Sequence, residues 1–359
     1  MELLSTEKPY LASIARRAFE KYCGLHGFEH YAGILALHGM ARLAIRTGAP
    51  RDQATIVCRL RPFADGRMEW RGNFPNYFAG GNATAYLLSK DLLSEAEDTV
   101  RERGGQQDKQ PRDGNGLFRH PRRPDQDAVW IDTAFAVTPF YLYAGLALEK
   151  SAWVDEAVHQ ALGHCRLLRN EDTGLLFQCV NFAGPGQLSE DHWSRGNGWG
   201  LHALTALILD LPATHARRQE VEACFVSLID AALKLQNDQG CWHQEMTDPK
   251  SYVESSGTFL ILQAIGAGIE AGVLDESYAA PLWRGLSGGV AYIAGDDFTV
   301  HNCCGGCLCP GAGTKTDYAA RGSILNDIHA FGPITHAFEQ AMAVDFSARF
   351  TASPNQKTK

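Results

Sequence analysis

The segment 193–199, with the sequence WSRGNGW, contains an arginine and a tryptophan at a spacing suited to binding chemistry. Arg195 and Trp199 are four residues apart, so they share one face if the segment is the first turn of a helix. An arginine can hold a carboxylate through two parallel hydrogen bonds, and an indole offers a flat apolar face to a sugar ring. Gly196 and Gly198 would let a ligand approach the backbone. The alternative is a glycine-rich helix entry with Arg195 in a salt bridge and Trp199 in the core.

A second candidate is Asp132, which follows Trp130 and Ile131 at the head of the most apolar helical stretch. The simplest role for an aspartate at this place is an N-cap that accepts backbone N–H bonds. A carboxyl beside Trp130 at the mouth of an apolar barrel would instead be desolvated. Its pKa would then rise, as a general acid requires. The residues alone leave both interpretations open.

Helical periodicity dominates the elements that must position these residues. Apolar residues recur at spacings of three and four in ten segments: 10–22, 31–45, 83–95, 133–149, 153–168, 200–211, 221–235, 257–271, 278–293 and 334–343. Alternating runs typical of strands are short and few, so we expect an all-α fold. The basic, Gly- and Pro-containing stretch 101–124 is predicted to be a solvated loop.

Four polar turns with a glycine, each followed by an aromatic residue, recur between the predicted helices. Their glycines, at positions 66, 116, 174 and 240, are 50, 58 and 66 residues apart, which is enough for two helices and their loops. Six such units would fill the 359 residues. We infer a closed ring of αα-hairpins with these turns at one end, where polar residues surround a common mouth; chance recurrence of Asp and Gly in turns is the alternative. The polar residues that follow the turns are Arg71, His120, Gln178 and His243.

Taken together, these motifs resemble the unsaturated glucuronyl and rhamnogalacturonyl hydrolases, glycoside hydrolase family 105 and its relative family 88. The resemblance rests on the sequence WIDT at 130–133 with Pro139-Phe140, and on RGNGW at 195–199. Further matches are the segment 240–244, the ESS sequence at 254–256, and a Gly-rich C-terminal block that ends in Asn326-Asp327. It covers roughly residues 74–343. The resemblance implies an (α/α)6 barrel of six αα-hairpins.

It also implies a reaction. Such enzymes remove a 4,5-unsaturated uronic acid from the non-reducing end of oligosaccharides made by polysaccharide lyases, by hydrating the C4=C5 double bond. By resemblance, Asp132 is the general acid and base, Arg195 and Trp199 hold the unsaturated sugar, and His120 and Trp130 line the pocket. No metal or organic cofactor is implied.

Two positions depart from the family pattern. Asn76 stands at or near the place of a second aspartate, and an amide cannot transfer a proton as a carboxyl does, although Asn76 can still hydrogen-bond the substrate. Gln178 stands where a histidine often follows the turn in the rhamnogalacturonyl enzymes, which weakens the case for rhamnogalacturonan among unsaturated glucuronides. His243 is a further pocket candidate near the mouth.

Two other functions stay open. A sugar 2-epimerase or isomerase on the same barrel type would use a histidine pair, for which His120 and His243 are candidates. A non-catalytic carbohydrate-binding relative is the other, because of Asn76. The histidines in helical stretches are expected to pack or cap rather than to catalyse; these are His26, His30, His38, His164 and His202.

Composition limits the partners. Forty-one acidic against 33 basic residues give a net charge of −8, which disfavours nucleic acid. The longest apolar run, 133–148, contains Pro139 and is too short to span a membrane. We expect one catalytic domain over 1–350, a disordered tail over 351–359, and a cytoplasmic protein with reduced thiols.

The CxxC spacing of Cys304 and Cys307 is a weak zinc signal, because four converging ligands are needed. The oligomeric state is not predicted.

Overall fold

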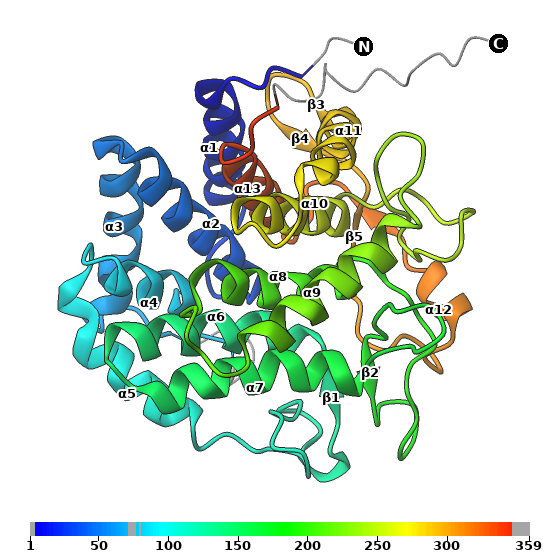
Figure 1. Ribbon diagram of the computed structural model, residues 1–359, viewed down its shortest axis with the longest axis horizontal. Coiled ribbons are helices and arrows are strands. Elements are labelled where there is room, and N and C mark those ends of the chain that lie inside the picture. The colour runs from blue at the N-terminus through cyan, green and yellow to red at the C-terminus, as the bar shows by residue number, and fades with distance from the viewer. Residues whose placement is uncertain (1–3, 71–76, 79, 347–359) are drawn as a thin grey trace.

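The computed structural model describes residues 4–70, 77–78 and 80–346, and its fold is a ring of helices (Figure 1). Six inner helices form the ring: α2 (Ala32–Thr47), α4 (Gly81–Ser89), α6 (Asp132–Ala147), α8 (Ser194–Asp210), α10 (Ser255–Glu270) and α13 (Phe331–Ala341). Each packs against the next, and α13 packs against α2, so that the ring closes within the described part of the chain. The predicted all-α, (α/α)6 fold is confirmed.

Outer helices complete the six hairpins. They are α1 (Lys8–Leu25), α3 (Pro50–Ala64), α5 (Glu97–Gln107), α7 (Ser151–Leu167), α9 (Arg218–Leu233) and α11 (Ala279–Gly289). Short 3-10 helices cover Ser94–Ala96, Pro124–Gln126, Glu276–Tyr278 and Val290–Tyr292. None of the helices in the described ranges is both long and apolar enough to cross a membrane.

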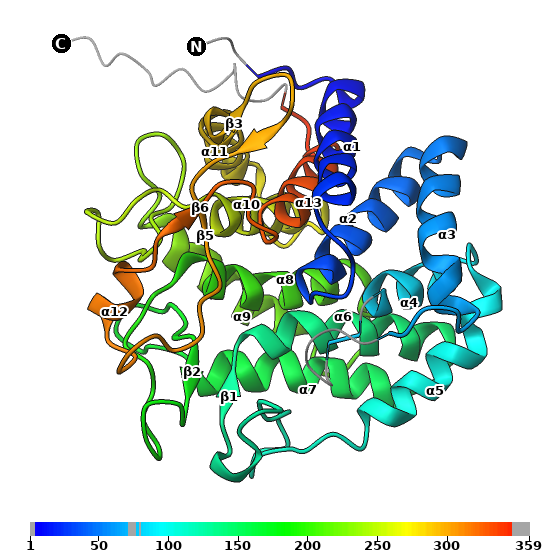
Figure 2. The ribbon, with the colours of Figure 1, turned by 180° about the vertical axis from the view of Figure 1, so that it is seen from behind.

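Short strand pairs and one short helix, α12 (Lys315–Ala319), decorate the ring. The antiparallel pairs are β1 (Val129–Trp130) with β2 (Cys179–Val180), β3 (Ile293–Ala294) with β4 (Thr299–Val300), and β5 (Cys303–Cys304) with β6 (Ser323–Ile324). In β1 and β2, Trp130 stands opposite Cys179. Both ribbon views place β1, β2, β5, β6 and α12 at the same end of the barrel (Figure 2).

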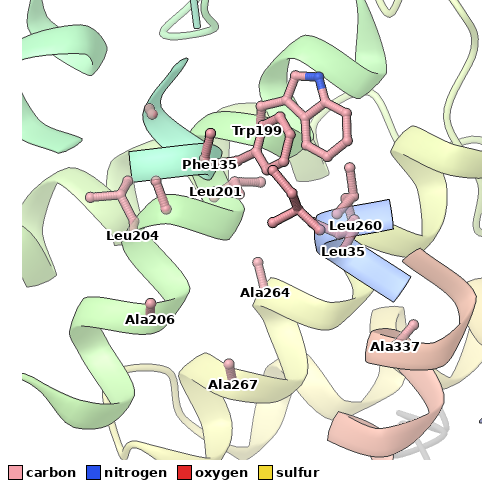
Figure 3. Packing of buried hydrophobic residues seen from close by; sticks show 14 of the residues in the cluster. Leu35, Phe135, Trp199, Leu201, Leu204, Ala206, Leu260, Ala264, Ala267 and Ala337 are labelled. Carbon is pink, nitrogen blue, oxygen red and sulfur yellow. The ribbon is translucent and has the colours of Figure 1, made fainter. Parts of the chain in front are cut away.

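The inner helices are buried almost all round, which explains why they are apolar on every face. Phe135 of α6 and Trp199 of α8 stack with ring centroids 4.1 Å apart (Figure 3). Glycine permits the close contact of α8 with α10, because a Cβ on Gly198 would lie 2.7 Å from the Leu260 side chain. Gly198 therefore serves helix packing, and the expected approach of a ligand to this backbone is wrong here.

The four predicted turns are present. Their glycines, Gly66, Gly116, Gly174 and Gly240, all have positive φ, between 76° and 84°. This backbone region is open to glycine without steric cost, which is why the glycines recur. In all four turns an Asx side chain accepts at least one backbone N–H bond from further along the turn; these side chains belong to Asp65, Asp113, Asn170 and Asn237.

Two element predictions were wrong. The stretch 101–124 is not all loop, because α5 continues to Gln107. Its sequence offers little apolar periodicity, and tertiary packing holds it: a Cβ on Gly104 would lie 2.1 Å from the Trp153 ring. The helix predicted over 83–95 ends at Ser89 instead. Asn76, Arg71 and the predicted tail 351–359 lie outside the described residues, and the single domain over 1–350 stays a prediction.

Candidate active site

A cavity of about 320 Å³ opens at the end of the barrel that carries the strand pairs. His30 and Tyr31, which precede α2, form part of its wall. Trp130 of β1 and the loop after β5 form another part, and Arg321 and His329 complete it. Segments from both termini and the middle of the chain therefore meet around one space.

Asp132 is buried completely, and it is linked to this cavity through Gln178, which contacts both Asp132 and Cys307 of the cavity wall. It is the first residue of α6 and the residue before the helix is Ile131, so Asp132 is not the N-cap of the simpler interpretation. Burial raises the pKa of Asp132 to about 7, against the opposing effects of Arg195 and of a hydrogen bond from Gln178. Oδ1 of Asp132 has no hydrogen-bond partner among the described residues. The carboxyl can thus hold a proton at neutral pH and has an oxygen left to deliver it.

Gln178 ties this carboxyl to the cavity wall. Its Nε2 donates to the Cys307 carbonyl at 2.7 Å and lies 3.4 Å from Oδ2 of Asp132. Its Oε1 accepts from the Tyr318 hydroxyl at 2.5 Å and from the Cys309 backbone N–H at 3.0 Å. Gln178 is fully buried, and these contacts fix the loop that contributes Cys307 to the cavity.

Arg195 is also fully buried, and its guanidinium is bonded to protein groups. It donates to the carbonyls of Cys304 at 2.6 Å and Gly305 at 2.8 Å, and to Oγ of Ser256 at 3.0 Å. The Glu254 carboxylate lies 3.9 Å away. Arg195 therefore anchors the cavity loop to the start of α8, and direct contact of Arg195 with a substrate stays a prediction. Trp199, 1% exposed, stacks on Phe135 below it.

His120 and Trp130 are neighbours. The two rings meet edge to face with centroids 4.5 Å apart, and Trp130 forms part of the cavity wall. Burial, followed by the charges of Arg123 and Arg122, lowers the pKa of His120 to about 4, so the ring is neutral at pH 7. Of this predicted pair, Trp130 lines the cavity, and His120 packs against Trp130.

His243 is held elsewhere, with Nδ1 2.5 Å from the Ser251 carbonyl oxygen. Its neighbour Gln244 is fully buried and donates to the Tyr318 carbonyl at 2.9 Å. Adjacent residues of an extended segment point to opposite sides. Gln244 and Gln178 both lie four residues after a turn glycine, and both contact Tyr318. Counting four residues onward from each turn glycine would have identified Gln244 as the counterpart of Gln178.

Sequence reasoning missed four residues of this region. Tyr31, His329 and Arg321 lie in the cavity wall, and Asp327 is bonded to His329. His30, which was expected to pack, also lines the cavity. A signal existed only for Asp327, which ends the Gly-rich block of the resemblance. The others have neither spacing nor helical periodicity to mark them.

Two clusters could bind a metal by residue type. Cys304 and Cys307 form a thiol pair, and the hydrogen bond from Cys307 lowers the pKa of Cys304 to about 7, although burial opposes it. In the described ranges, however, the cysteines form no group of three converging ligands. His38, His202 and His336 do form such a group, inside the barrel.

Comparison with known proteins agrees with this geometry. Residues 25–343 match the family model described as Glycosyl Hydrolase Family 88. The unsaturated rhamnogalacturonyl hydrolase YesR of Bacillus subtilis is 26% identical over 161 residues, which are 44% of this chain and 47% of the relative. An unsaturated 3S-rhamnoglycuronyl hydrolase of Formosa agariphila is 33% identical over 172 residues, 44% and 46% of the two chains. The aligned region thus spans about half the length of these curated relatives.

Solved structures share the fold across the whole chain. A possible member of the GH105 family from Salmonella enterica serovar Paratyphi A superposes with a TM-score of 0.82 at 18% identity, covering 94% of each chain. A family 105 glycoside hydrolase of C. acetobutylicum gives 0.79 at 20% identity, covering 93% of this chain and 99% of the other. Because the family model spans the ring and its cavity, the chain belongs to glycosyl hydrolase family 88.

Proposed function

We propose that this protein removes a 4,5-unsaturated uronic acid from the non-reducing end of an oligosaccharide by hydrating the C4=C5 double bond. One observation carries the proposal: Asp132 is fully buried, is linked through Gln178 to Cys307 of the cavity wall, and has a pKa raised to about 7. Protonation of C4 needs an acid that keeps its proton near neutral pH, and Asp132 meets this need. The names of the two relatives, both unsaturated-sugar hydrolases, support the substrate class.

In this mechanism Asp132 transfers its proton to C4, and water adds its oxygen to C5. The resulting hemiketal opens and releases the aglycone. The spacing rule for the two carboxylates of ordinary glycosidases does not apply, because the anomeric carbon is not attacked. The exposed Arg321 in the cavity wall is the cation that we propose for the uronate carboxylate, with Arg195 adding positive potential from below.

The test follows the ultraviolet absorbance of the conjugated double bond in lyase-generated disaccharides. We expect wild type and the exposed control Asp172→Asn to remove the absorbance, and Asp132→Asn to leave it. Unchanged absorbance with wild type on pectin-, ulvan-, arabinogalactan- and glycosaminoglycan-derived substrates would contradict the proposal. Tight binding without turnover would favour the carbohydrate-binding alternative.

The epimerase alternative finds less support. His120 contacts Trp130 and Phe182, whereas His243 contacts Ser251, so the proposed histidine pair sits in two different surroundings. A cytoplasmic location remains part of the proposal, because a reducing compartment suits the free cysteines of the described chain.

A further inference from the structure

Tyr31 in the cavity wall begins a chain of short hydrogen bonds. Its hydroxyl oxygen lies 2.7 Å from Nε2 of His329, and Nδ1 of His329 lies 2.6 Å from Oδ1 of Asp327. The three side chains are nearly buried, at 8%, 3% and 9% exposure. Tyr31 and His329 are 298 residues apart in sequence, yet both line the cavity.

The charges of this chain define where its protons lie. Burial, followed by the charge of Arg195, lowers the pKa of His329 to about 4, so its ring is neutral at pH 7. Burial alone would raise the pKa of Asp327, but the hydrogen bonds from His329 and the charges of His329 and Arg195 together outweigh it, and the pKa is lowered. A neutral imidazole beside a carboxylate carries its proton on Nδ1 and donates it there. Nε2 is then the acceptor, and the Tyr31 hydroxyl donates to it.

Tyr31 also lies within the electrostatic reach of Asp132. After burial, the charge of Asp132 is the largest cause of the raised pKa of Tyr31. Asp132 is the first residue of α6 and Tyr31 directly precedes α2, so the two groups come from different inner helices of the ring. The resemblance assigns both proton transfers to Asp132, but this geometry supplies a second group: one can give a proton to C4 while the other takes a proton from the water that attacks C5.

We propose that Tyr31 is the general base for the attacking water, and that His329 and Asp327 position it and receive its proton; this rests on the function proposed above. The O–H bond of water breaks as its oxygen bonds to C5. That proton passes to the phenolic oxygen, and the phenolic proton passes to Nε2 of His329. The π electrons of C4=C5 take the proton of Asp132 at C4. One water is added in total, and the imidazolium faces the Asp327 carboxylate until it returns its proton through Tyr31 to Asp132 or solvent.

The test compares kcat and KM on an unsaturated disaccharide that wild type hydrates. Tyr31→Phe keeps the ring and removes the hydroxyl, and we expect kcat to fall about 100-fold while KM changes little. His329→Gln can still accept the hydrogen bond but cannot take the proton, so kcat falls in the same way. Tyr22→Phe is the matched control, because the Tyr22 hydroxyl donates to the Gly27 carbonyl at 2.9 Å and does not line the cavity; its kcat stays at the wild-type value.

A double variant separates a relay from independent structural roles. Because Asp327 acts through Tyr31, Tyr31→Phe with Asp327→Asn should lose no more kcat than Tyr31→Phe alone. The relay is wrong if the kcat losses of the two single substitutions multiply in the double variant, or if Tyr31→Phe or His329→Gln keeps the full kcat. Either result leaves the proposed function intact. A wild type that hydrates no unsaturated uronide overturns both. Thermal melts show whether each variant is folded. If Tyr31→Phe does not fold, the kcat of His329→Gln alone tests the relay.

Discussion

At the scale of single residues, the site depends on opposing effects at Asp132. Burial disfavours the carboxylate, whereas Arg195, the Gln178 amide and the position at a helix N-terminus favour it. Burial dominates, and the pKa of Asp132 rises to about 7. The sequence pointed to this carboxyl correctly. It could not show that Arg195 is occupied by two backbone carbonyls, because those carbonyls belong to a loop more than 100 residues away.

The first prediction concerns the pH dependence of activity. Since Asp132 must be protonated to act as the acid, kcat/KM should be level below pH 7 and fall about tenfold per pH unit above it. A pH series of the absorbance assay measures this. Activity that stays level up to pH 9 would exclude Asp132 as the acid.

The same pKa predicts a stability change. Because the folded state holds the Asp132 proton more tightly than the unfolded state, wild type loses stability as pH rises from about 4 to 7. Asp132→Asn lacks this loss and should be more stable than wild type by about 4 kcal/mol at pH 8, with no difference near pH 3. Urea unfolding at both pH values measures it, and the exposed control Asp172→Asn should show no such dependence.

At the scale of elements, the turns were easier to predict than the helices they join. A glycine with positive φ is a local requirement, so Gly66, Gly116, Gly174 and Gly240 revealed the repeat directly. The helix α5 was missed because only Val100, Gly104 and Gln107 of its residues are buried, which leaves no apolar stripe to detect. Its helical state depends on contact with Trp153 and its neighbours.

The turn between α9 and α10 supplies a test at this scale. A Cβ on Gly240 would lie 2.4 Å from the Gly285 backbone nitrogen, in addition to the strain of φ +84°. Gly240→Ala should therefore cost about 3 kcal/mol or more of unfolding free energy, twice the cost of φ strain alone. Gly66→Ala, with φ +77° and open space around it, should cost about 1 to 2 kcal/mol. Equal losses would show that the close approach to α11 is not important.

At the scale of the whole molecule, the first and last inner helices close the ring through buried charges. Glu339 of α13, 1% exposed, pairs with Arg42 and Arg46 of α2. Arg46 in turn pairs with Glu270 of α10 at 2.8 Å. These charged residues lie on α2, α10 and α13. The last inner helix, α13, lies beside the first, α2, only because the ring closes.

Breaking the network should loosen the closure. Glu339→Gln leaves Arg42 and Arg46 with less compensation, and we expect a loss of about 3 kcal/mol with a lower Tm. The exposed pair Arg51 and Glu20 provides the control, because Glu20→Gln should change stability by less than about 0.5 kcal/mol. Equal effects of the two substitutions would contradict a role of Glu339 in closing the ring.

The sequence by itself determined the all-α class and the repeat, because periodicity and turn glycines are local properties, whereas Asp132, Trp130 and His120 were grouped together by the family resemblance. Only the tertiary structure decided the rest. It joined Tyr31 to His329 and Asp327, gathered His38, His202 and His336 inside the ring, and set Gln244 rather than His243 beside Tyr318. Hydrogen bonding and desolvation depend on which distant segments are packed together, and ring closure brings them together.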